Sequence, residues 1–85
     1  MKEIIVTVKD VRDSFIHDME IPTDVPMNLV IKEMTDNLIL MHRSLPLFRG
    51  RFRVQCSRTG KYIAPGKTAE ECGIWNGDYL VFSEV

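Results

Sequence analysis

The chain has 85 residues, of which 45% are hydrophobic and 27% charged, and a formal net charge of −1. This composition is typical of a soluble globular protein and excludes a disordered or fibrous chain. A chain of this length hides only about 60 to 65% of the surface that its unfolded form exposes, so we expect a single domain over residues 1–85 without a deep catalytic cleft.

Two β-strands are predicted in the first 21 residues. Residues 4–8 (IIVTV) are β-branched, and their alternation places Ile5 on the opposite face from Ile4 and Val6. Residues 15–21 (FIHDMEI) alternate in the same way, and the polar DVRD segment between the two runs supplies turn residues. The two segments therefore predict a β-hairpin.

An amphipathic helix is predicted after this hairpin. Pro26 suits the first position of a helix, because the N–H that proline lacks would have no partner there. From Met27 onward the apolar residues recur three or four positions apart, as expected for a helix of about four turns that buries one face. The apolar stripe comprises Met27, Val30, Ile31, Met34, Leu38 and Met41.

The second half of the chain predicts mainly short strands. Residues 51–57 (RFRVQCS) alternate, residues 62–64 form a short strand, residues 68–72 one helical turn, and residues 78–85 the last strand. One helix must then cover one face of a mixed sheet of four to five strands. We expect an α+β chain with the β-grasp, or ubiquitin-like, fold and the strand order 2-1-5-3-4.

The segment CGIWNGDYLVF, residues 72–82, is interpreted as the approach to the last strand. Asn76-Gly77-Asp78 is predicted to be the turn that directs this strand, and Gly77 can adopt a positive φ there without steric cost. Ile74, Leu80 and Phe82 are expected in the core.

Catalytic, metal-binding and cofactor-binding motifs do not occur in the sequence. Cys56 and Cys72 form no Cys-x-x-Cys pair and are expected to be free thiols. Neither His17 nor His42 lies at a recognised spacing from a thiol or a carboxylate. We expect no enzymatic activity, no metal, no cofactor and no small-molecule substrate. A catalytic Cys72 would need a nearby base, which only folding could bring close to it.

Hydropathy gives no sign of membrane insertion. Residues 38–41 form the longest apolar run, which is far shorter than the roughly 20 residues that span a bilayer. The N-terminus alternates instead of forming the apolar block of a signal peptide. We expect a cytoplasmic protein that does not insert into a membrane.

The charges are distributed unevenly along the chain. No acidic residue lies between Asp36 and Glu70. The basic 43–67 segment within this stretch raises the alternative function of nucleic-acid or polyanion binding. A pI near 6.1 and acidic flanks weaken attraction to a polyanion, so nucleic acid is not the expected partner. The basic residues of the segment are Arg43, Arg49, Arg51, Arg53, Arg58, Lys61 and Lys67.

The alternation also predicts which residues face solvent on the side of the sheet opposite the helix. This open face should run from acidic residues on the second strand, through a partly apolar middle, to basic residues on the third. Arginines beside an aromatic residue are enriched in protein interfaces, and the alternative is a solvated face whose charges serve solubility. Trp75, at the tip of a turn, either caps the rim of the core or contacts a partner. The other candidate interaction residues are Ile5, Arg51, Arg53, Gln55, Tyr79 and Val81.

The length, the order of elements and two segments resemble the YukD/EsaB family of ubiquitin-like proteins. The segments are IPTDVPMNLVIKEM at the start of the helix and KYIAPGKTAEECGIWNGDYLVF near the end of the chain, with CGI-x-NGD-x-L as the most specific part. The resemblance implies a cytoplasmic, non-conjugating interaction module, an accessory or regulatory component of a type VII secretion system in Gram-positive bacteria, without known catalysis. Its partner would be a protein of the secretion machinery.

The sequence departs from ubiquitin in two ways. Ubiquitin and the sulfur carriers act through a C-terminal Gly-Gly, whereas this chain ends in FSEV and contains no Gly-Gly dipeptide. We therefore expect neither conjugation nor sulfur transfer. The third-strand part of ubiquitin's apolar recognition patch is replaced here by arginine and glutamine, so classical ubiquitin-binding domains are not expected to bind.

Overall fold

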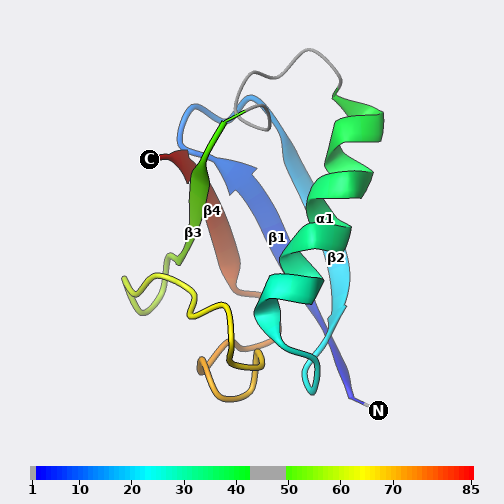
Figure 1. Ribbon diagram of the computed structural model, residues 1–85, viewed down its shortest axis with the longest axis vertical. Helices are drawn as coiled ribbons and strands as arrows, with labels where there is room; N and C mark the ends of the chain where they lie inside the picture. The colour runs from blue at the N-terminus through cyan, green and yellow to red at the C-terminus, as the bar shows by residue number, and fades with distance from the viewer. Residues whose placement is uncertain (1, 43–49) are drawn as a thin grey trace.

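The computed structural model describes residues 2–42 and 50–85, and in these ranges it contains a sheet and one α-helix (Figure 1). The strands are β1 (Glu3–Asp10), β2 (Ile16–Pro22), β3 (Phe52–Cys56) and β4 (Tyr79–Glu84), and the helix is α1 (Met27–Met41). The prediction of a hairpin, a helix and C-terminal strands is confirmed.

The sheet is mixed, with the strands in the order β2-β1-β4-β3. β1 pairs antiparallel with β2 and parallel with β4, and β3 pairs antiparallel with β4. Helix α1 lies across one face of this sheet (Figure 1). The expected α+β arrangement is therefore present, with the last strand in the middle of the sheet.

The short strand predicted at residues 62–64 is wrong as a strand, because only an isolated bridge between Gln55 and Tyr62 forms there. The chain then turns toward the start of α1, where the carbonyl oxygens of Pro65 and Lys67 accept hydrogen bonds from the first N–H groups of the helix, at 2.9 and 2.8 Å. A helix begins with N–H groups that have no partner within it. Satisfying them diverts residues 65–67 from the sheet, so the predicted order 2-1-5-3-4 becomes β2-β1-β4-β3.

The start of the helix differs by one residue from the prediction. Pro26 has φ −53° and ψ 136° and is the residue before the first helical turn, rather than the first residue within it. At residues 68–72 the predicted single turn is present, since Thr68 and Glu71 each accept a side-chain hydrogen bond from the other's backbone N–H, at 3.2 and 3.0 Å. This reciprocal pair is a capping box.

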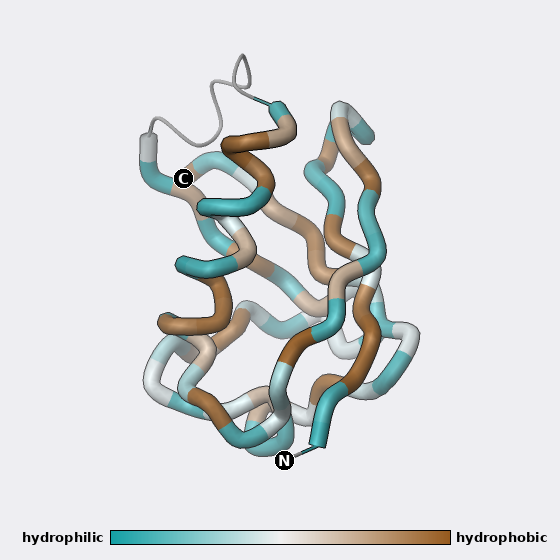
Figure 2. The backbone as a smooth tube through the Cα atoms, turned by 90° about the vertical axis from the view of Figure 1, so that its right-hand side faces the viewer, coloured by the Kyte–Doolittle hydropathy of each residue, from teal (hydrophilic) through white to brown (hydrophobic). Residues whose placement is uncertain are grey.

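The core lies between α1 and the sheet and follows the predicted periodicities. Figure 2 shows hydrophobic and hydrophilic residues alternating along the helix and the strands. The helix stripe is buried except for Ile31, which is half-buried, and Met41, which is exposed at the helix end. No helix in the described ranges is long and apolar enough to cross a bilayer. The buried apolar side chains of the sheet include Val6, Val8, Ile21, Val54, Cys56, Leu80 and Phe82.

Candidate interaction surface

The sheet face opposite α1 is open, and the strand register fixes the neighbours on it. Thr7 lies beside Asp18 on β2 and Tyr79 on β4. One step along, Lys9 lies beside Ile16 and Val81, and Val81 in turn lies beside Gln55 on β3. Because side chains alternate between the faces of a strand, these neighbours share the open face.

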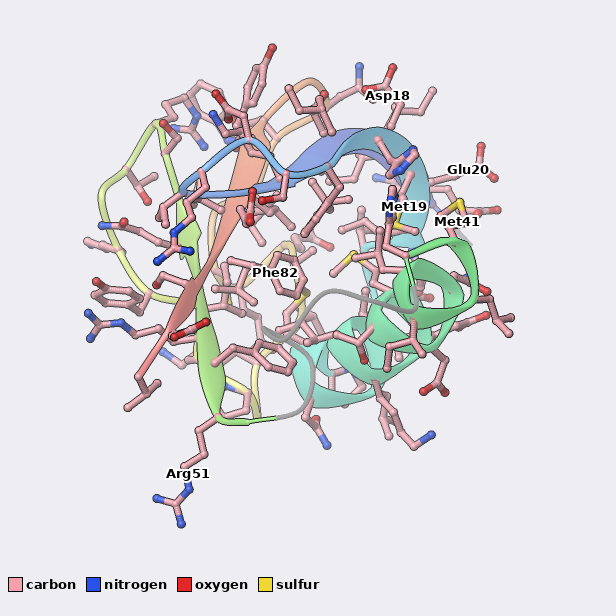
Figure 3. The ribbon with its side chains drawn as sticks, turned by 90° about the horizontal axis from the view of Figure 1, so that it is seen from above. Asp18, Met19, Glu20, Met41, Arg51 and Phe82 are labelled. Carbon is pink, nitrogen blue, oxygen red and sulfur yellow. The ribbon has the colours of Figure 1, made fainter. Side chains whose placement is uncertain are left out.

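Five of the seven predicted interaction residues are brought together on this face. Ile5 and Tyr79 are each 49% exposed, Arg53 is exposed, and Gln55 and Val81 are half-buried between neighbouring side chains. Arg51 precedes β3 and extends away from the body of the sheet, at the periphery of the face (Figure 3). We call Ile5, Arg53, Gln55, Tyr79 and Val81 the open-face patch.

The basic side of the open-face patch is held by an aromatic residue that the sequence did not single out. The guanidinium carbon of Arg53 lies 4.3 Å from the centre of the Tyr62 ring, which is 48% exposed. The isolated bridge to Gln55 positions Tyr62, and the Gln55 side-chain amide donates to the Gly60 carbonyl at 2.8 Å. A cation over an aromatic ring is favourable and orients the arginine.

Lys9 was also missed as a surface residue, because β1 was predicted to end at Val8. The strand continues to Asp10, so Lys9 lies in the middle of the open face next to Val81, and its ammonium pairs with the Asp13 carboxylate. The alternation of residues 4–8 extended by one step would have found it. The acidic side is at β2, where Asp18 accepts a hydrogen bond from the Thr7 hydroxyl at 2.7 Å.

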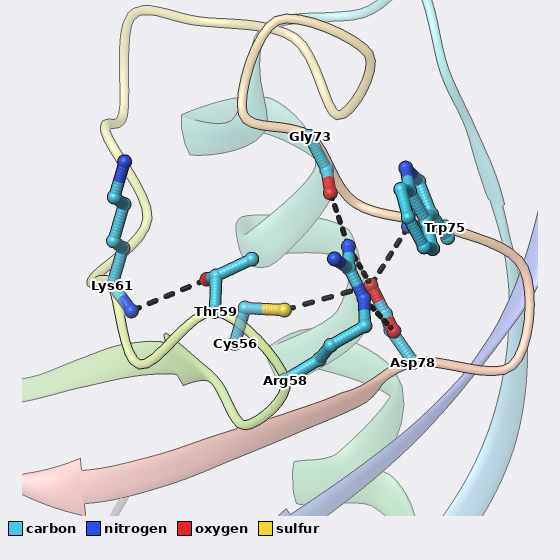
Figure 4. A network of polar contacts seen from close by, with 7 residues as sticks. All are labelled: Cys56, Arg58, Thr59, Lys61, Gly73, Trp75 and Asp78. Carbon is cyan, nitrogen blue, oxygen red and sulfur yellow. Dashed lines mark hydrogen bonds and ion pairs between the residues drawn. The ribbon is translucent and has the colours of Figure 1, made fainter.

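A buried carboxylate joins the end of β3 to the turn before β4 (Figure 4). Asp78, only 7% exposed, accepts hydrogen bonds from Arg58 Nε and Nη2, both at 2.9 Å, and from the Trp75 N–H at 2.8 Å. The Cys56 thiol lies 3.5 Å from the same carboxylate. The bonds from Arg58 lower the pKa of the Asp78 carboxyl, and the pKa of Arg58 is raised by the same pairing.

The predicted turn at Asn76-Gly77-Asp78 is confirmed and is tied to β1. Gly77 has φ +88° and donates its N–H to the Ile5 carbonyl at 2.7 Å, while the Asn76 side-chain oxygen accepts from the Ile5 N–H at 2.8 Å. The turn therefore continues the pairing of β1 and β4 ahead of Tyr79, the first residue of β4. This places Trp75, one residue earlier, close to the Ile5 end of the open face.

Trp75 does not cap the rim of the core, because its side chain is 63% exposed. The Arg58 guanidinium carbon lies 3.7 Å from the centre of the indole ring, and Arg58 is fixed from its other side by Asp78. The exposed indole is therefore oriented by a charge network, a property that suits a contact residue.

We expect Trp75→Ala to leave the fold nearly unchanged. An exposed cation–π contact contributes about 0.5 to 1 kcal/mol, and Arg58 keeps its ion pair with Asp78 in the variant. Urea denaturation followed by circular dichroism measures the difference in the free energy of unfolding. A loss larger than about 2 kcal/mol would mean that the indole serves the core, as large buried side chains do.

The histidines and cysteines lie at different places in the fold. The Nε2 atoms of His17 and His42 are 2.7 Å apart, beside Phe15, near the C-terminal end of α1. Both thiols are free; Cys56 is buried and contacts Asp78, and the Cys72 sulfur lies 3.9 Å from the Ala64 carbonyl oxygen. The histidines thus contact each other, and each thiol contacts an oxygen.

Comparison with known proteins gives matches only to solved structures, since no known protein family and no curated protein matches the sequence. The ubiquitin-like domain of the type VII secretion system protein EccD1 of Mycobacterium tuberculosis is 18% identical with a TM-score of 0.75, over 99% of this chain and 100% of that one. The EccD5 ubiquitin-like domain from Mycobacterium xenopi is 15% identical with a TM-score of 0.76, over 100% and 97%. A ubiquitin-like domain from Arabidopsis thaliana is 19% identical with a TM-score of 0.67, over 99% and 79%.

Matches with identities of 15 to 19% show a similarity of fold alone. The structural similarity to these domains extends over 99% or more of this chain. The strand order β2-β1-β4-β3 with one covering helix agrees with this similarity. The chain has the β-grasp fold of ubiquitin-like domains.

Proposed function

We propose that this chain is a non-catalytic, non-conjugating protein-interaction module, a cytoplasmic accessory component of a bacterial type VII secretion system. In this proposal the open-face patch, with Arg51 and Trp75 at its periphery, docks on a protein of the secretion machinery. The YukD/EsaB resemblance supports a Gram-positive source and a regulatory or accessory role.

The observation that carries the proposal is the composition of the open face. Tyr79 and Ile5 expose apolar surface next to Arg53, whose guanidinium is already ordered over Tyr62. Tyrosine and arginine are enriched among the residues that dominate binding energy, and an ordered side chain loses less entropy on binding. The face thus combines apolar area with a fixed cation.

The structural neighbours support the choice of secretion system. One of the matched ubiquitin-like domains belongs to the type VII secretion system protein EccD1, and another belongs to EccD5. Both matches extend over nearly all of this chain. A fold hosts many functions, so this likeness supports the proposal by analogy.

A non-catalytic role is supported by what the reactive side chains contact. The two imidazoles share a hydrogen bond with each other, and the Cys56 thiol is buried against Asp78. A nucleophilic thiol is activated by a neighbouring base or cation. The Cys72 sulfur lies 3.9 Å from the Ala64 carbonyl oxygen, in a cavity that Lys61, Lys67 and Glu71 also line.

The alternative, polyanion binding by the basic 43–67 segment, loses support because one of its cations is already paired with a carboxylate. Arg58 is paired with Asp78, and Arg53 lies on the open face. Lys61 and Lys67 line a cavity together with Cys56 and Glu71. Arg43 and Arg49 lie outside the described residues. Polyanion affinity depends on many cations acting on one phosphate track.

Charge reversal at the basic side of the open face tests the proposal. We expect Arg51→Glu combined with Arg53→Glu to leave the circular dichroism spectrum unchanged and to abolish co-purification of the tagged chain with the secretion machinery. The physical reason is that a fixed cation in the interface becomes an anion. A like-charge contact costs several kcal/mol of binding free energy, which is enough to prevent co-purification.

The matched control is Lys61→Glu combined with Lys67→Glu, which changes the net charge equally and also lies in the 43–67 segment. Docking through the open face predicts that this control still co-purifies with the machinery. Unchanged co-purification of the Arg51 and Arg53 variant would remove the open face from consideration. A salt-sensitive mobility shift with DNA that both variants abolish would establish polyanion binding instead.

A further inference from the structure

The outer side of β2 has hydrogen-bonding groups without a strand partner in the described part of the chain, because β2 is an edge strand. The Thr23 N–H donates to the Lys2 carbonyl, and the Thr7 N–H donates away from β2 to the Asp78 carbonyl. In an antiparallel pair the bonded and non-bonded positions alternate. This pattern leaves the backbone N–H and C=O groups of Asp18 and Glu20 pointing outward.

A groove of about 340 Å³ runs between this edge and α1. Its apolar part is formed by Met19 and Ile21 from β2 and by Val30 and Met34 from the helix. Met19 points toward α1, whereas Asp18 and Glu20 project on the other side of the strand (Figure 3). The free backbone edge and an apolar groove therefore lie next to each other along β2.

Three acidic residues lie along the same groove: Glu3 and Glu20, at strand positions that face away from α1, and Glu33 on the helix. A hydrogen bond with Glu20, followed by the negative charge of Glu20, raises the pKa of the Glu3 carboxyl. Two carboxylates this close raise a pKa because a second negative charge is unfavourable. On the helix, the Lys32 ammonium pairs with the Asp36 carboxylate at 3.0 Å, and Asp36 does not line the groove.

We propose that the groove between β2 and α1 binds an extended segment of a partner protein, which adds a strand to the β2 edge and places a lysine or arginine beside the Glu3 and Glu20 carboxylates, on the side of the added strand that faces away from α1. Backbone hydrogen bonds to Asp18 and Glu20 supply affinity, and alternate side chains supply specificity. Apolar side chains of the segment enter the groove beside Met19 and Met34. The site adjoins the open-face patch, because Glu20 lies beside Ile5 in the sheet register.

Charge selects a basic partner over a second copy of this chain. Pairing two β2 edges would place Asp18 and Glu20 of one copy against the same acids of the other, and facing like charges are destabilising. Edge strands commonly carry charges that prevent such self-pairing. The acids that oppose self-association are the ones that attract a cationic strand.

Selection of peptides tests this proposal without knowledge of the natural partner. Random dodecapeptides displayed on phage are selected on the immobilised chain, and the enriched peptides are titrated into the ¹⁵N-labelled protein. We expect sequences that alternate β-branched residues with lysine or arginine, amide shifts at Asp18 and Glu20, and slower hydrogen exchange at these two amides. The pKa of the Glu3 carboxyl should fall toward its usual range when the peptide is bound, because a cation favours the ionised form.

Two variants of equal charge change locate the site. Glu20→Lys with Glu33→Lys should weaken binding of the selected peptide by about tenfold or more, because both acids become cations that repel the lysine or arginine of the peptide. Glu84→Lys with Asp36→Lys changes exposed acids that do not line the groove and should change affinity by less than about twofold at moderate salt.

Three outcomes would overturn the proposal. The first is a selection that enriches no peptide, or only peptides without basic residues. The second is a set of shifts confined to Tyr79 and Val81, which would move the peptide to the open face. The third is a concentration-dependent shift at Asp18 and Glu20 without peptide, which would assign the β2 edge to a second copy.

Discussion

Asp78→Asn is expected to lower the free energy of unfolding by about 2 to 3 kcal/mol, which corresponds to a fall in Tm of about 10 to 20 °C for a domain of this size. The substitution keeps one oxygen for the Trp75 N–H but removes the charge that Arg58 contacts at 2.9 Å through two nitrogens. Asp78 is buried whereas the Arg58 side chain is 35% exposed, so the loss comes from the charge-assisted hydrogen bonds of the carboxylate. Thermal denaturation at pH 7 measures the loss.

The pH dependence of this loss identifies its cause. Hydrogen bonding to Arg58 holds the pKa of Asp78 below its usual 3.8. A depressed pKa in the folded state gives stability that is fully present above the usual value and is lost as the pH falls through the folded value. The difference in Tm between wild type and Asp78→Asn should therefore be full at pH 7 and shrink below about pH 4.

A control carboxylate comes from the helix surface. Asp36→Asn removes an exposed ion pair with Lys32, and pairs of this kind contribute about 0.3 to 0.5 kcal/mol on a helix. Its Tm should stay close to that of the wild type. An Asp78→Asn loss that is equally small, or one that persists unchanged at pH 2.5, would contradict an ionic role for Asp78.

The sequence predicts the regular elements well because each element has one buried face. The helix begins and ends at the residues that its apolar stripe marks, Met27 and Met41. Residues 62–64 show where this reasoning fails: they have strand-like composition, but the following carbonyls are needed by the first turn of α1. That demand arises from a segment almost 40 residues away along the chain, and local periodicity carries no trace of it.

The open face was predictable for the same reason as the core, since alternation that buries Leu80 and Phe82 must expose Tyr79 and Val81. The network at Asp78 was not. The Asn-Gly-Asp segment predicts a turn, which is correct, but the partner of Asp78 is Arg58, 20 residues earlier and within a segment that appears uniformly basic. Pairing across the fold therefore removes one cation from the candidate polyanion surface. The groove at β2 was missed as well, because it forms only when Glu33 of the helix and Glu20 of the strand come to lie along the same edge of the fold.

Phe82→Ala should have the largest effect on stability of any change discussed. Phe82 is fully buried, with its ring centre 6.2 Å from that of Phe15 and 5.4 Å from that of Phe52, and it lies near the centre of the molecule (Figure 3). Truncation of a buried phenylalanine costs about 3 to 5 kcal/mol through lost burial and the cavity that remains. A domain of 85 residues has a total stability of roughly 4 to 13 kcal/mol, so the variant should be close to unfolding at 37 °C. Urea denaturation followed by tryptophan fluorescence gives the midpoint.

Val81→Ala on the same strand is the matched variant, because Val81 is half-buried and faces the other side of the sheet. It should lower stability by about 1 kcal/mol or less, as surface substitutions do. If the open face binds the partner, Val81→Ala weakens co-purification while the urea midpoint hardly changes, whereas Phe82→Ala loses both together. A Phe82→Ala protein that keeps the wild-type midpoint would contradict the position of this ring in the core. Neighbouring positions on β4 thus separate the loss of the fold from the loss of the contact.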